Sequence, residues 1–293
     1  MQKQKQTPGR QGPGVAFVLF STICFSIEPI AAKVAYRGGA TVMTTLTLRY
    51  FLAAVTFWLL TLAGGCPFRL PRRQLLAVVA LSLGTQTPTV LALFEAFRYI
   101  PAGMAILFLY FYPTVVTILA FFFLKEPFTW QKALALLLTL AGCAVILGQP
   151  VKTLDPRGVI LSLTAAFTYA IFLVGSTRLL ASIETPVYNA CVSTILALAV
   201  GGLALTSRQL NLFFSSQALV AIGVLGIVST VLAMAALMRG VKEIGASRAA
   251  IISTFEPVAT AVLGFLVLGE SLTSWQMIGG AAVLAGVFLQ RRT

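Results

Sequence analysis

The sequence alternates long apolar stretches with short polar breaks that hold charged residues, Gly and Pro. A helix needs about 20 mostly apolar residues to cross the hydrocarbon core of a bilayer, and ten stretches come close to that length. Strands of a transmembrane barrel would instead be about ten residues long with alternating polarity, and this pattern is missing. The sequence therefore predicts an all-α integral membrane protein with ten transmembrane helices, at residues 14–35, 42–64, 74–97, 101–124, 130–148, 157–180, 186–206, 216–238, 245–268 and 273–290.

The composition is that of a membrane protein rather than a soluble domain. Of the 293 residues, 58% are hydrophobic and 10% are charged, whereas soluble domains carry about 25% charged residues. The formal net charge of +13 is spread as single Lys and Arg residues between apolar runs, and nucleic-acid binders instead cluster such residues on a polar face. We therefore expect the lipid bilayer as a partner and no nucleic acid.

The residue types that carry most metal and cofactor chemistry are scarce. The chain has no His, a single Asp (Asp155) and four scattered Cys without a CxxC pair. His-ligated metals and His proton relays are therefore excluded, and a Cys inside an apolar run behaves as a small hydrophobe. We expect no metal, no cofactor and no disulfide.

The orientation in the membrane follows from the Lys and Arg residues, which are enriched in cytoplasmic loops. With ten spans both termini share one side, and that side carries 14 of these residues against 6 on the other, with Arg49 inside the second span. The first span is too long for the apolar core of a cleaved signal peptide. We predict a multi-pass protein of the inner membrane with both termini in the cytoplasm and a disordered tail at residues 1–13.

The two halves of the chain repeat each other at a constant offset of 144 residues. This offset joins Pro113 to Pro257 and Glu126 to Glu270 without a gap. Each half holds five spans, and an odd number places the second copy in the membrane in the opposite sense. Inverted repeats are typical of secondary transporters with a substrate site near the midplane, and a duplicated scaffold without a transport role is the alternative. The predicted repeats are residues 14–148 and 157–290.

Short motifs recur in both halves. The first half holds Arg98-Tyr-Ile-Pro-Ala, Tyr112-Pro113 and Leu124-Lys-Glu126-Pro, and the second holds Lys242-Glu-Ile-Gly-Ala, Glu256-Pro257 and Leu268-Gly-Glu270, while the second span carries Leu48-Arg49-Tyr50-Phe51. Over nearly the whole chain these motifs resemble the EamA-type transporters of the drug/metabolite transporter superfamily. The first span departs from them, with Cys24-Phe25-Ser26-Ile27-Glu28-Pro29 where such proteins often carry a Trp. The resemblance implies ten helices, export or exchange of small metabolites, and no nucleotide hydrolysis.

Ionisable residues inside the spans are the first candidates for a site, because they are costly in lipid and usually face a cavity, a partner or a pathway. Glu28 lies mid-span and precedes Pro29, which breaks a helix hydrogen bond beside the carboxylate. It could bind a cation or amine, or form a structural pair with Arg49 or Lys33. Arg49 could hold a substrate carboxylate in a bidentate fork or extend its charged end to the interface.

Glu256 is the strongest single candidate. It precedes Pro257 at the place where the first repeat has Tyr112 and Pro113, and its carboxylate could exchange a proton for substrate. Hydroxyl, amide and aromatic groups of the spans could complete a pocket, although each could equally serve as a contact between helices. These further substrate-binding candidates are Gln86, Thr89, Tyr110, Tyr112, Tyr169, Asn189 and Ser253, and the predicted helix kinks are at Pro29, Pro88, Pro113 and Pro257.

Other features predict structural roles. Glu126 and Glu270 end the fourth and ninth spans, and we expect each to cap or pair with the start of the following helix. The fifth and tenth spans are nearly uncharged and rich in Ala and Gly, for instance Ala282 and Gly286. Small residues at this spacing allow close packing, so these spans are candidates for a homodimer contact.

The leading hypothesis is a secondary active or facilitative transporter, an exporter of small metabolites such as amino acids or amines. It would work by alternating access, with the two five-helix halves rocking against each other. The alternative is a membrane-embedded enzyme acting on a lipid-linked substrate, which would need clustered carboxylates or His near an interface. A channel is the third hypothesis, but channels usually repeat around an axis normal to the membrane.

Overall fold

The computed structural model describes residues 11–66, 70–96, 98–100, 102–147, 154–268 and 274–291. Within these ranges all regular structure is helical, and seven helices are long and apolar enough to cross a membrane, with two shorter apolar helices beside them. The α-helices, with η marking π-helical segments, are α1 (Gln11–Ser26), α2 (Glu28–Arg37), α3 (Val42–Ala63), α4 (Arg72–Leu81), η2 (Ser82–Gln86), α5 (Thr87–Ala96), α6 (Ala102–Leu109), α7 (Tyr112–Leu119), η3 (Ala120–Leu124), α8 (Trp130–Leu147), α9 (Pro156–Leu179), α10 (Thr185–Thr206), α11 (Ser216–Gly226), η4 (Ile227–Leu232), α12 (Ala233–Ile244), α13 (Ala246–Ser253), α14 (Glu256–Leu268) and α15 (Ser274–Arg291).

The prediction of an all-helical membrane protein is confirmed for the described residues. The number of ten spans stays a prediction. One part of the predicted tail is wrong. Helix α1 begins at Gln11, so the last three residues of the tail at 1–13 are helical, because the chain there already continues into the apolar run of the first span. Residues 1–10 lie outside the described residues.

Three spans are broken in the middle, each immediately before a proline. The breaks separate α1 from α2, α6 from α7, and α13 from α14, and Pro29, Pro113 and Pro257 each occupy the second position of the helix that follows. Proline is tolerated in a first helical turn, where its missing N–H would be unsatisfied anyway. The chain at Pro88 behaves differently, because the helix continues through it and the π-helical segment η2 lies just before it.

The π-helical segments η2 and η4 occupy nearly equivalent places in the two halves at the 144-residue offset. In η4 the hydroxyl of Thr230 donates to the carbonyl of Leu225, five residues back, at 2.8 Å. Such single-turn π segments are often found at functional sites. The hydrophobic pattern did not indicate them, since one extra residue in a turn leaves a span as apolar as before.

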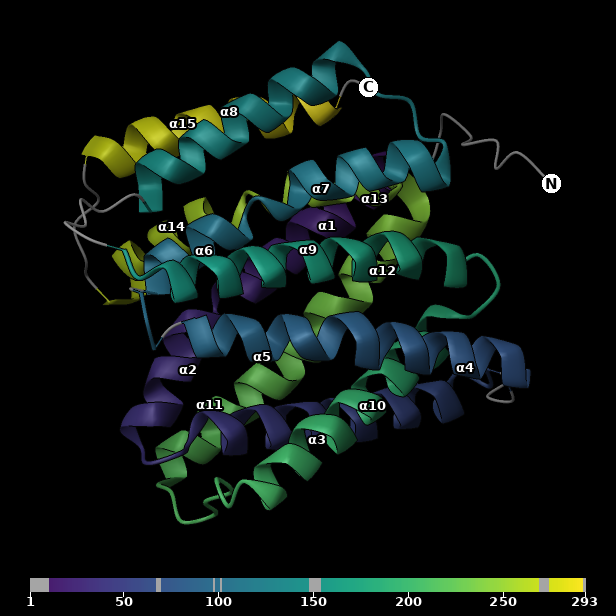
Figure 1. The fold of residues 1–293 in the computed structure, drawn as a ribbon, viewed down its shortest axis with the longest axis vertical. Coiled ribbons are helices and arrows are strands. Elements are labelled where there is room, and N and C mark those ends of the chain that lie inside the picture. The colour runs from purple at the N-terminus through teal and green to yellow at the C-terminus, as the bar shows by residue number, and fades with distance from the viewer. Residues whose placement is uncertain are drawn as a thin grey trace.

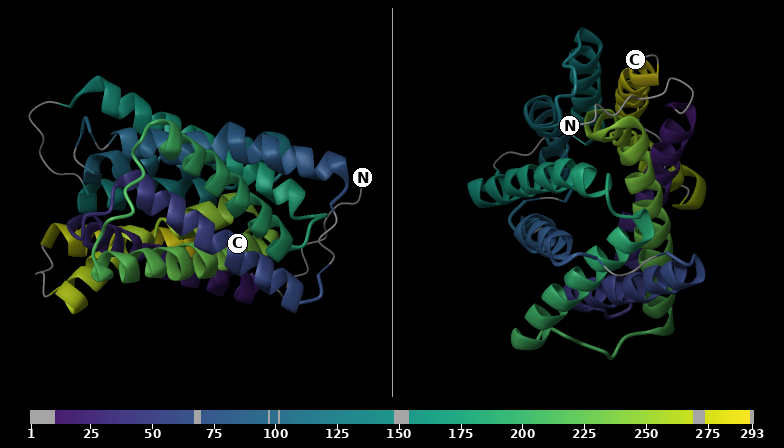
Figure 2. Two further views of the ribbon diagram at one scale, coloured as in Figure 1. Left: turned by 90° about the horizontal axis from the view of Figure 1, so that it is seen from below. Right: turned by 90° about the vertical axis from the view of Figure 1, so that its right-hand side faces the viewer.

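Helices from the two halves interleave rather than forming two separate bundles. The first helix of each half packs against the third span of the other, so that α1 lies against α12 and α9 lies against α5. Equivalent helices also pair directly, α3 with α10 and α8 with α15, at opposite ends of the molecule (Figure 1). In the right-hand view of Figure 2, α8 and α15 stand side by side near the C-terminus. The centre of the molecule is therefore built from both halves of the chain.

Small residues hold α8 and α15 together. A Cβ placed on Gly142 would lie 2.6 Å from the carbonyl oxygen of Gly279, and one on Gly286 would lie 2.9 Å from that of Ala135. Only glycine allows backbones to approach this closely. The small residues that suggested a homodimer are thus used inside one chain, and a dimer through these helices stays a prediction that would have to use their outer faces.

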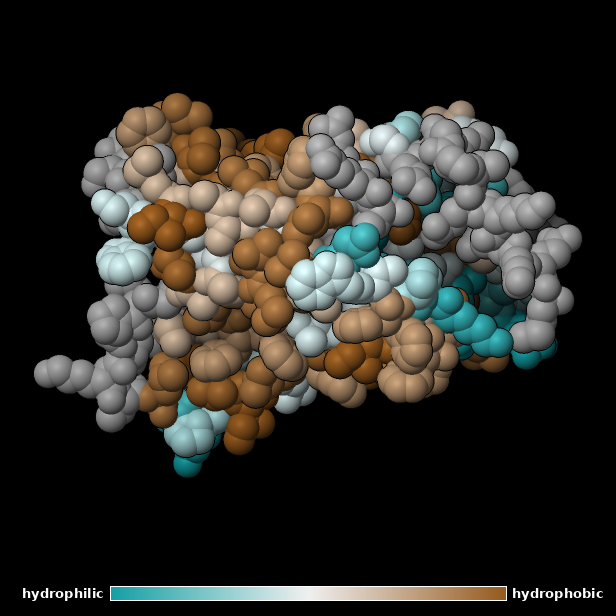
Figure 3. Space-filling view, turned by 90° about the horizontal axis from the view of Figure 1, so that it is seen from above, coloured by the Kyte–Doolittle hydropathy of each residue, from teal (hydrophilic) through white to brown (hydrophobic). Residues whose placement is uncertain are grey.

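The outer surface is apolar where lipid would contact it. In Figure 3 hydrophobic residues cover most of one face, while hydrophilic residues gather toward its right-hand end. Large apolar side chains such as Phe122 (69% exposed) and Leu137 (65% exposed) project outward. In water such a surface would aggregate, so the surface is consistent with a bilayer environment.

Candidate functional site

The first cluster of charged residues joins three helical segments from both halves. Arg49 of α3 donates from its two Nη atoms to the two carboxylate oxygens of Glu28, at 2.5 and 2.8 Å, and from Nε to the hydroxyl of Thr230 in η4, at 2.7 Å. The Arg49 side chain is only 8% exposed and that of Glu28 is 29% exposed. The guanidinium therefore has its planar fork filled by a carboxylate, the geometry that Arg favours.

This geometry excludes one of the two interpretations of Arg49, namely that its charged end extends to the membrane interface. The guanidinium does not extend to the interface, because it is buried among α2, α3 and η4 and also lies over the Tyr50 ring, 5.4 Å from its centroid. The expectation that its charged end reaches the interface is therefore wrong. Of the two partners considered for Glu28, Arg49 is the one in contact. Thr230 was missed by the sequence interpretation, although the Ser229-Thr230 pair is a polar interruption in an otherwise apolar span.

The second cluster lies where the broken spans meet. Glu256 begins α14, and its carboxylate lies close to the hydroxyl of Tyr110, which directly follows α6. Tyr112, the first residue of α7, lies close to Ser253, the last residue of α13. The two helix breaks of different halves therefore face each other, and each contributes one polar side chain to the other.

A group of aromatic rings lies near this carboxylate. The ring centroids of Tyr110 and Tyr112 are 6.4 Å apart, and Tyr169 of α9 meets Tyr112 edge to face at 4.8 Å. Tyr169 in turn stacks on Phe172 at 6.3 Å. Tyr110 and Tyr112 are buried, and Phe172 is fully buried. The wall facing Glu256 is thus a set of phenol rings supplied by α6, α7 and α9.

The two clusters interact. Glu256 lies within electrostatic reach of Glu28, and Tyr169 lies within reach of both carboxylates. Glu28, Tyr169, Ser253 and Glu256 are all only half-buried although they lie well inside the spans. These side chains are therefore partly accessible inside the spans.

The remaining candidates lie elsewhere. Thr89 is hydrogen-bonded to Thr168 at 2.8 Å, which links α5 to α9 and supports the structural alternative for this residue. Gln86 and Asn189 are buried, and among the described residues Gln86 Oε1 and both amide atoms of Asn189 have no hydrogen-bond partner. Segment η2, which carries Gln86, packs against α10, which carries Asn189. Among the described residues, no hydrogen bond joins either amide to Glu256 or to the tyrosines near it.

Glu126 has a role that sequence reasoning found only in part. Its carboxylate accepts from Lys132 Nζ of the following helix α8 at 3.2 Å, as expected, and also from the backbone N–H of Ala246 at 3.0 Å, which caps α13 of the other half. Gly245 has a φ of +84°, and a Cβ there would lie 2.7 Å from Glu126 Oε1. This close approach requires glycine. The equivalent Glu270 lies outside the described residues.

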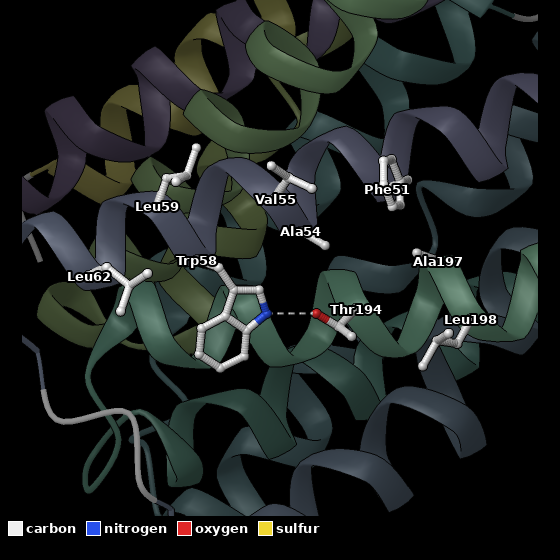
Figure 4. A pocket seen from close by; sticks show the side chains of 9 residues that line it. All are labelled: Phe51, Ala54, Val55, Trp58, Leu59, Leu62, Thr194, Ala197 and Leu198. Atoms are coloured by element: carbon white, nitrogen blue, oxygen red, sulfur yellow. Dashed lines mark hydrogen bonds between the residues drawn. The ribbon is translucent and has the colours of Figure 1, made fainter.

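Two grooves open on the outside of the helices rather than at the polar clusters. One, of about 390 Å³, lies between α3 and α10, and Figure 4 shows its apolar side chains with Trp58 donating to Thr194 at 3.0 Å. The other, of about 480 Å³, lies between α2 and α11 and begins at Ile27, next to Glu28. Both are lined mainly by apolar residues, which is typical of surfaces in contact with lipid. Within the described part of the chain no group of His, Cys, Asp and Glu has the arrangement of a metal site.

Comparisons with known proteins agree with this architecture. The model described as the EamA-like transporter family matches residues 12–148 and again residues 156–291. The chain is 27% identical to the "Uncharacterized transporter YcbK" of Bacillus subtilis, over 97% of this chain and 94% of that one, and 29% identical to an "Uncharacterized transporter" of Archaeoglobus fulgidus, over 94% and 95%. A solved structure described only as the crystal structure of a protein shares the fold, with a TM-score of 0.82 at 19% identity over 95% of this chain and 96% of that one.

Proposed function

The chain belongs to the EamA-like transporter family, and on that premise we propose that it is a secondary active or facilitative exporter of small metabolites, such as amino acids or amines. Membrane transport itself is the function of the family and of the relatives named above. The finer proposal places ten helices as two inverted repeats in the inner membrane, with both termini in the cytoplasm. Alternating access would move the substrate past the polar clusters.

One observation carries the proposal. Polar residues meet at helix breaks that belong to opposite halves, where α7 packs against α13 and Tyr110 of the first half lies close to Glu256 of the second. A break frees backbone groups and leaves room at mid-membrane, where irregular backbone is tolerated only if it lines a cavity or is covered by protein. Nothing in the described residues favours the alternative of a membrane-embedded enzyme.

The interleaved packing indicates which helices would move together. Helix α1 packs against α12, α13 and α14, whereas α9 packs against α5, α6 and α7. We propose that these two groups, each drawn from both repeats, rock against each other, in place of the two sequence halves expected from the repeat alone. Tyr110 and Tyr112 then lie on one group and Ser253 and Glu256 on the other, so movement would open and close the site.

Glu126 would hold the two groups together at the end that we predict to be cytoplasmic, because it contacts Ala246 of the opposite group. We call this contact the latch. Replacing it with Ala removes the cap of α13 and the Lys132 pair. Loss of a helix cap costs about 0.5–2 kcal/mol, so the cytoplasm-open state should gain about tenfold in population. A single Cys placed at Ser253, with the four native Cys replaced by Ser, should react about tenfold faster with a charged thiol reagent added from that side.

Glu95 provides the control for the latch. It is an exposed carboxylate at the end of α5, and among the described residues its ion pair is with Arg98, three positions along the chain. Glu95→Ala should leave the reaction rate at position 253 unchanged. An unchanged rate in Glu126→Ala as well would exclude a latch at this residue.

The direct test of the proposed function is substrate flux. Liposomes that contain the purified protein and are preloaded with unlabelled amino acids and amines should exchange them for labelled compounds added outside. Liposomes with the same contents but without the protein should not. A thermal-shift screen of the same compounds selects the candidates, because a ligand that binds the folded state raises its stability by mass action. If no compound stabilises the protein and none is exchanged, the proposal of a metabolite transporter fails.

A further inference from the structure

We infer that the site takes a small organic monocation, an ammonium group carried on a compact apolar body, with Glu256 as its counterion and the rings of Tyr110, Tyr112 and Tyr169 around it. This inference rests on the proposed function and narrows its substrate class from amino acids and amines to amines.

The first argument is the balance of charge. Among the described residues the ion pairs use Glu28, Glu95, Glu126 and Glu243, and Glu256 is in none of them. The polar group close to it is the neutral hydroxyl of Tyr110. A carboxylate removed from water without a compensating charge is expensive. A bound proton or a bound cation would compensate it.

The second argument concerns the rings. Tyr112 and Tyr169 meet edge to face at 4.8 Å and Tyr110 adjoins Tyr112 at 6.4 Å, and all three tyrosines are electrostatic neighbours of Glu256. A cation within about 6 Å of such faces is attracted by the ring quadrupole. Rings of this kind would also cover the apolar body of an amine without requiring hydrogen bonds from it.

The third argument disfavours substrates that carry a carboxylate. Arg49, the cation paired with Glu28, already has Nη1, Nη2 and Nε engaged by Glu28 and Thr230. Because Arg49 neutralises Glu28, the Glu256 carboxylate is left as the uncompensated anionic group of this cluster. It would attract a cation on the ligand and repel a ligand carboxylate.

Three probes that share a phenethyl body and differ in their charged groups test the inference. Phenethylammonium is a monocation, phenylalanine adds a carboxylate to it, and 3-phenylpropionate keeps the carboxylate without the amine. Isothermal titration of the detergent-purified protein should give binding of phenethylammonium at least about tenfold tighter than that of phenylalanine, because repulsion by an uncompensated carboxylate costs more than about 1.4 kcal/mol. 3-Phenylpropionate should not bind.

Variants of Tyr169 test the aromatic wall separately. Tyr169→Leu removes the ring and should weaken phenethylammonium binding about tenfold, since a desolvated cation–π contact is worth that much. Tyr169→Phe keeps the ring and should weaken phenethylammonium binding clearly less than Tyr169→Leu does. Phe122→Leu removes a ring from the lipid-facing surface, where Phe122 is 69% exposed, and should bind as the parent does.

The outcomes separate this inference from the proposed function. If phenylalanine or 3-phenylpropionate binds as tightly as the amine, or if Tyr169→Leu binds the amine as the parent does, the monocation site is overturned while a metabolite transporter remains. If none of the three probes binds but other amino acids are exchanged in liposomes, the inference is again wrong. If no compound of the exchange screen is moved, the proposed function itself fails.

Discussion

Replacing Glu256 with Gln should lower substrate flux in proteoliposomes by about tenfold to a hundredfold. The substitution keeps the size of the side chain and its contact with Tyr110 but removes the one carboxylate of the described residues that lies inside the spans without an ion pair. A hydrogen bond between the substrate and a charged carboxylate contributes about 1.5–3 kcal/mol. Each 1.4 kcal/mol lost corresponds to about a factor of ten in the rate or in binding. If Glu256 also exchanges substrate for a proton, uptake driven by an imposed pH gradient should be lost in the variant.

The control is the same chemical change at a carboxylate outside the site. Glu95 lies at the end of α5, where its side chain is 42% exposed, and Glu95→Gln should transport as the parent does. Both variants should elute as folded, monodisperse protein. Flux through Glu256→Gln equal to that of Glu95→Gln would remove Glu256 from the transport mechanism.

Replacing Arg49 with Ala should destabilise the protein by about 3 kcal/mol. The change leaves the Glu28 carboxylate without its bidentate partner and Thr230 without its donor. Removing one member of a buried ion pair costs about 3–5 kcal/mol because the other charge stays behind, and the lower value applies here since Glu28 is 29% exposed. Thermal unfolding in detergent should show a decrease in Tm of about 5–10 °C.

A double-mutant cycle separates the lost pair from a general packing defect. Glu28→Gln combined with Arg49→Ala removes both charges, so the double variant should be more stable than Arg49→Ala alone. Arg49→Lys keeps the charge without the planar fork and should fall between the parent and Arg49→Ala. If the effects of Glu28→Gln and Arg49→Ala simply add, the pair contributes no coupling and the two residues act independently.

Much of the candidate site could be predicted because its residues are anomalies in an apolar sequence. Glu28, Arg49 and Glu256 stand out in any stretch long enough to cross a bilayer, and the positions of Pro29, Pro113 and Pro257 coincide with observed helix breaks. The same reasoning placed Gln86, Thr89 and Asn189 with them, although Thr89 links two helices and the amides lie at a separate helix contact. The hydrophobic pattern shows in which span a polar residue lies. It does not show toward which neighbouring helix the side chain points.

The membrane class, the approximate helix positions, the 144-residue offset between the halves and the short list of charges within the spans follow from the sequence, because they depend on local composition and spacing. The partners of these charges depend on how the helices pack. Arg49 and Thr230 are 181 positions apart, and Glu126 and Ala246 are 120 apart; such contacts exist only once helices of the two halves have interleaved. The apolar surface of a helix can pack in lipid against many neighbours with similar energy, so the hydrophobic pattern leaves open which helices become neighbours, and with them which polar groups meet.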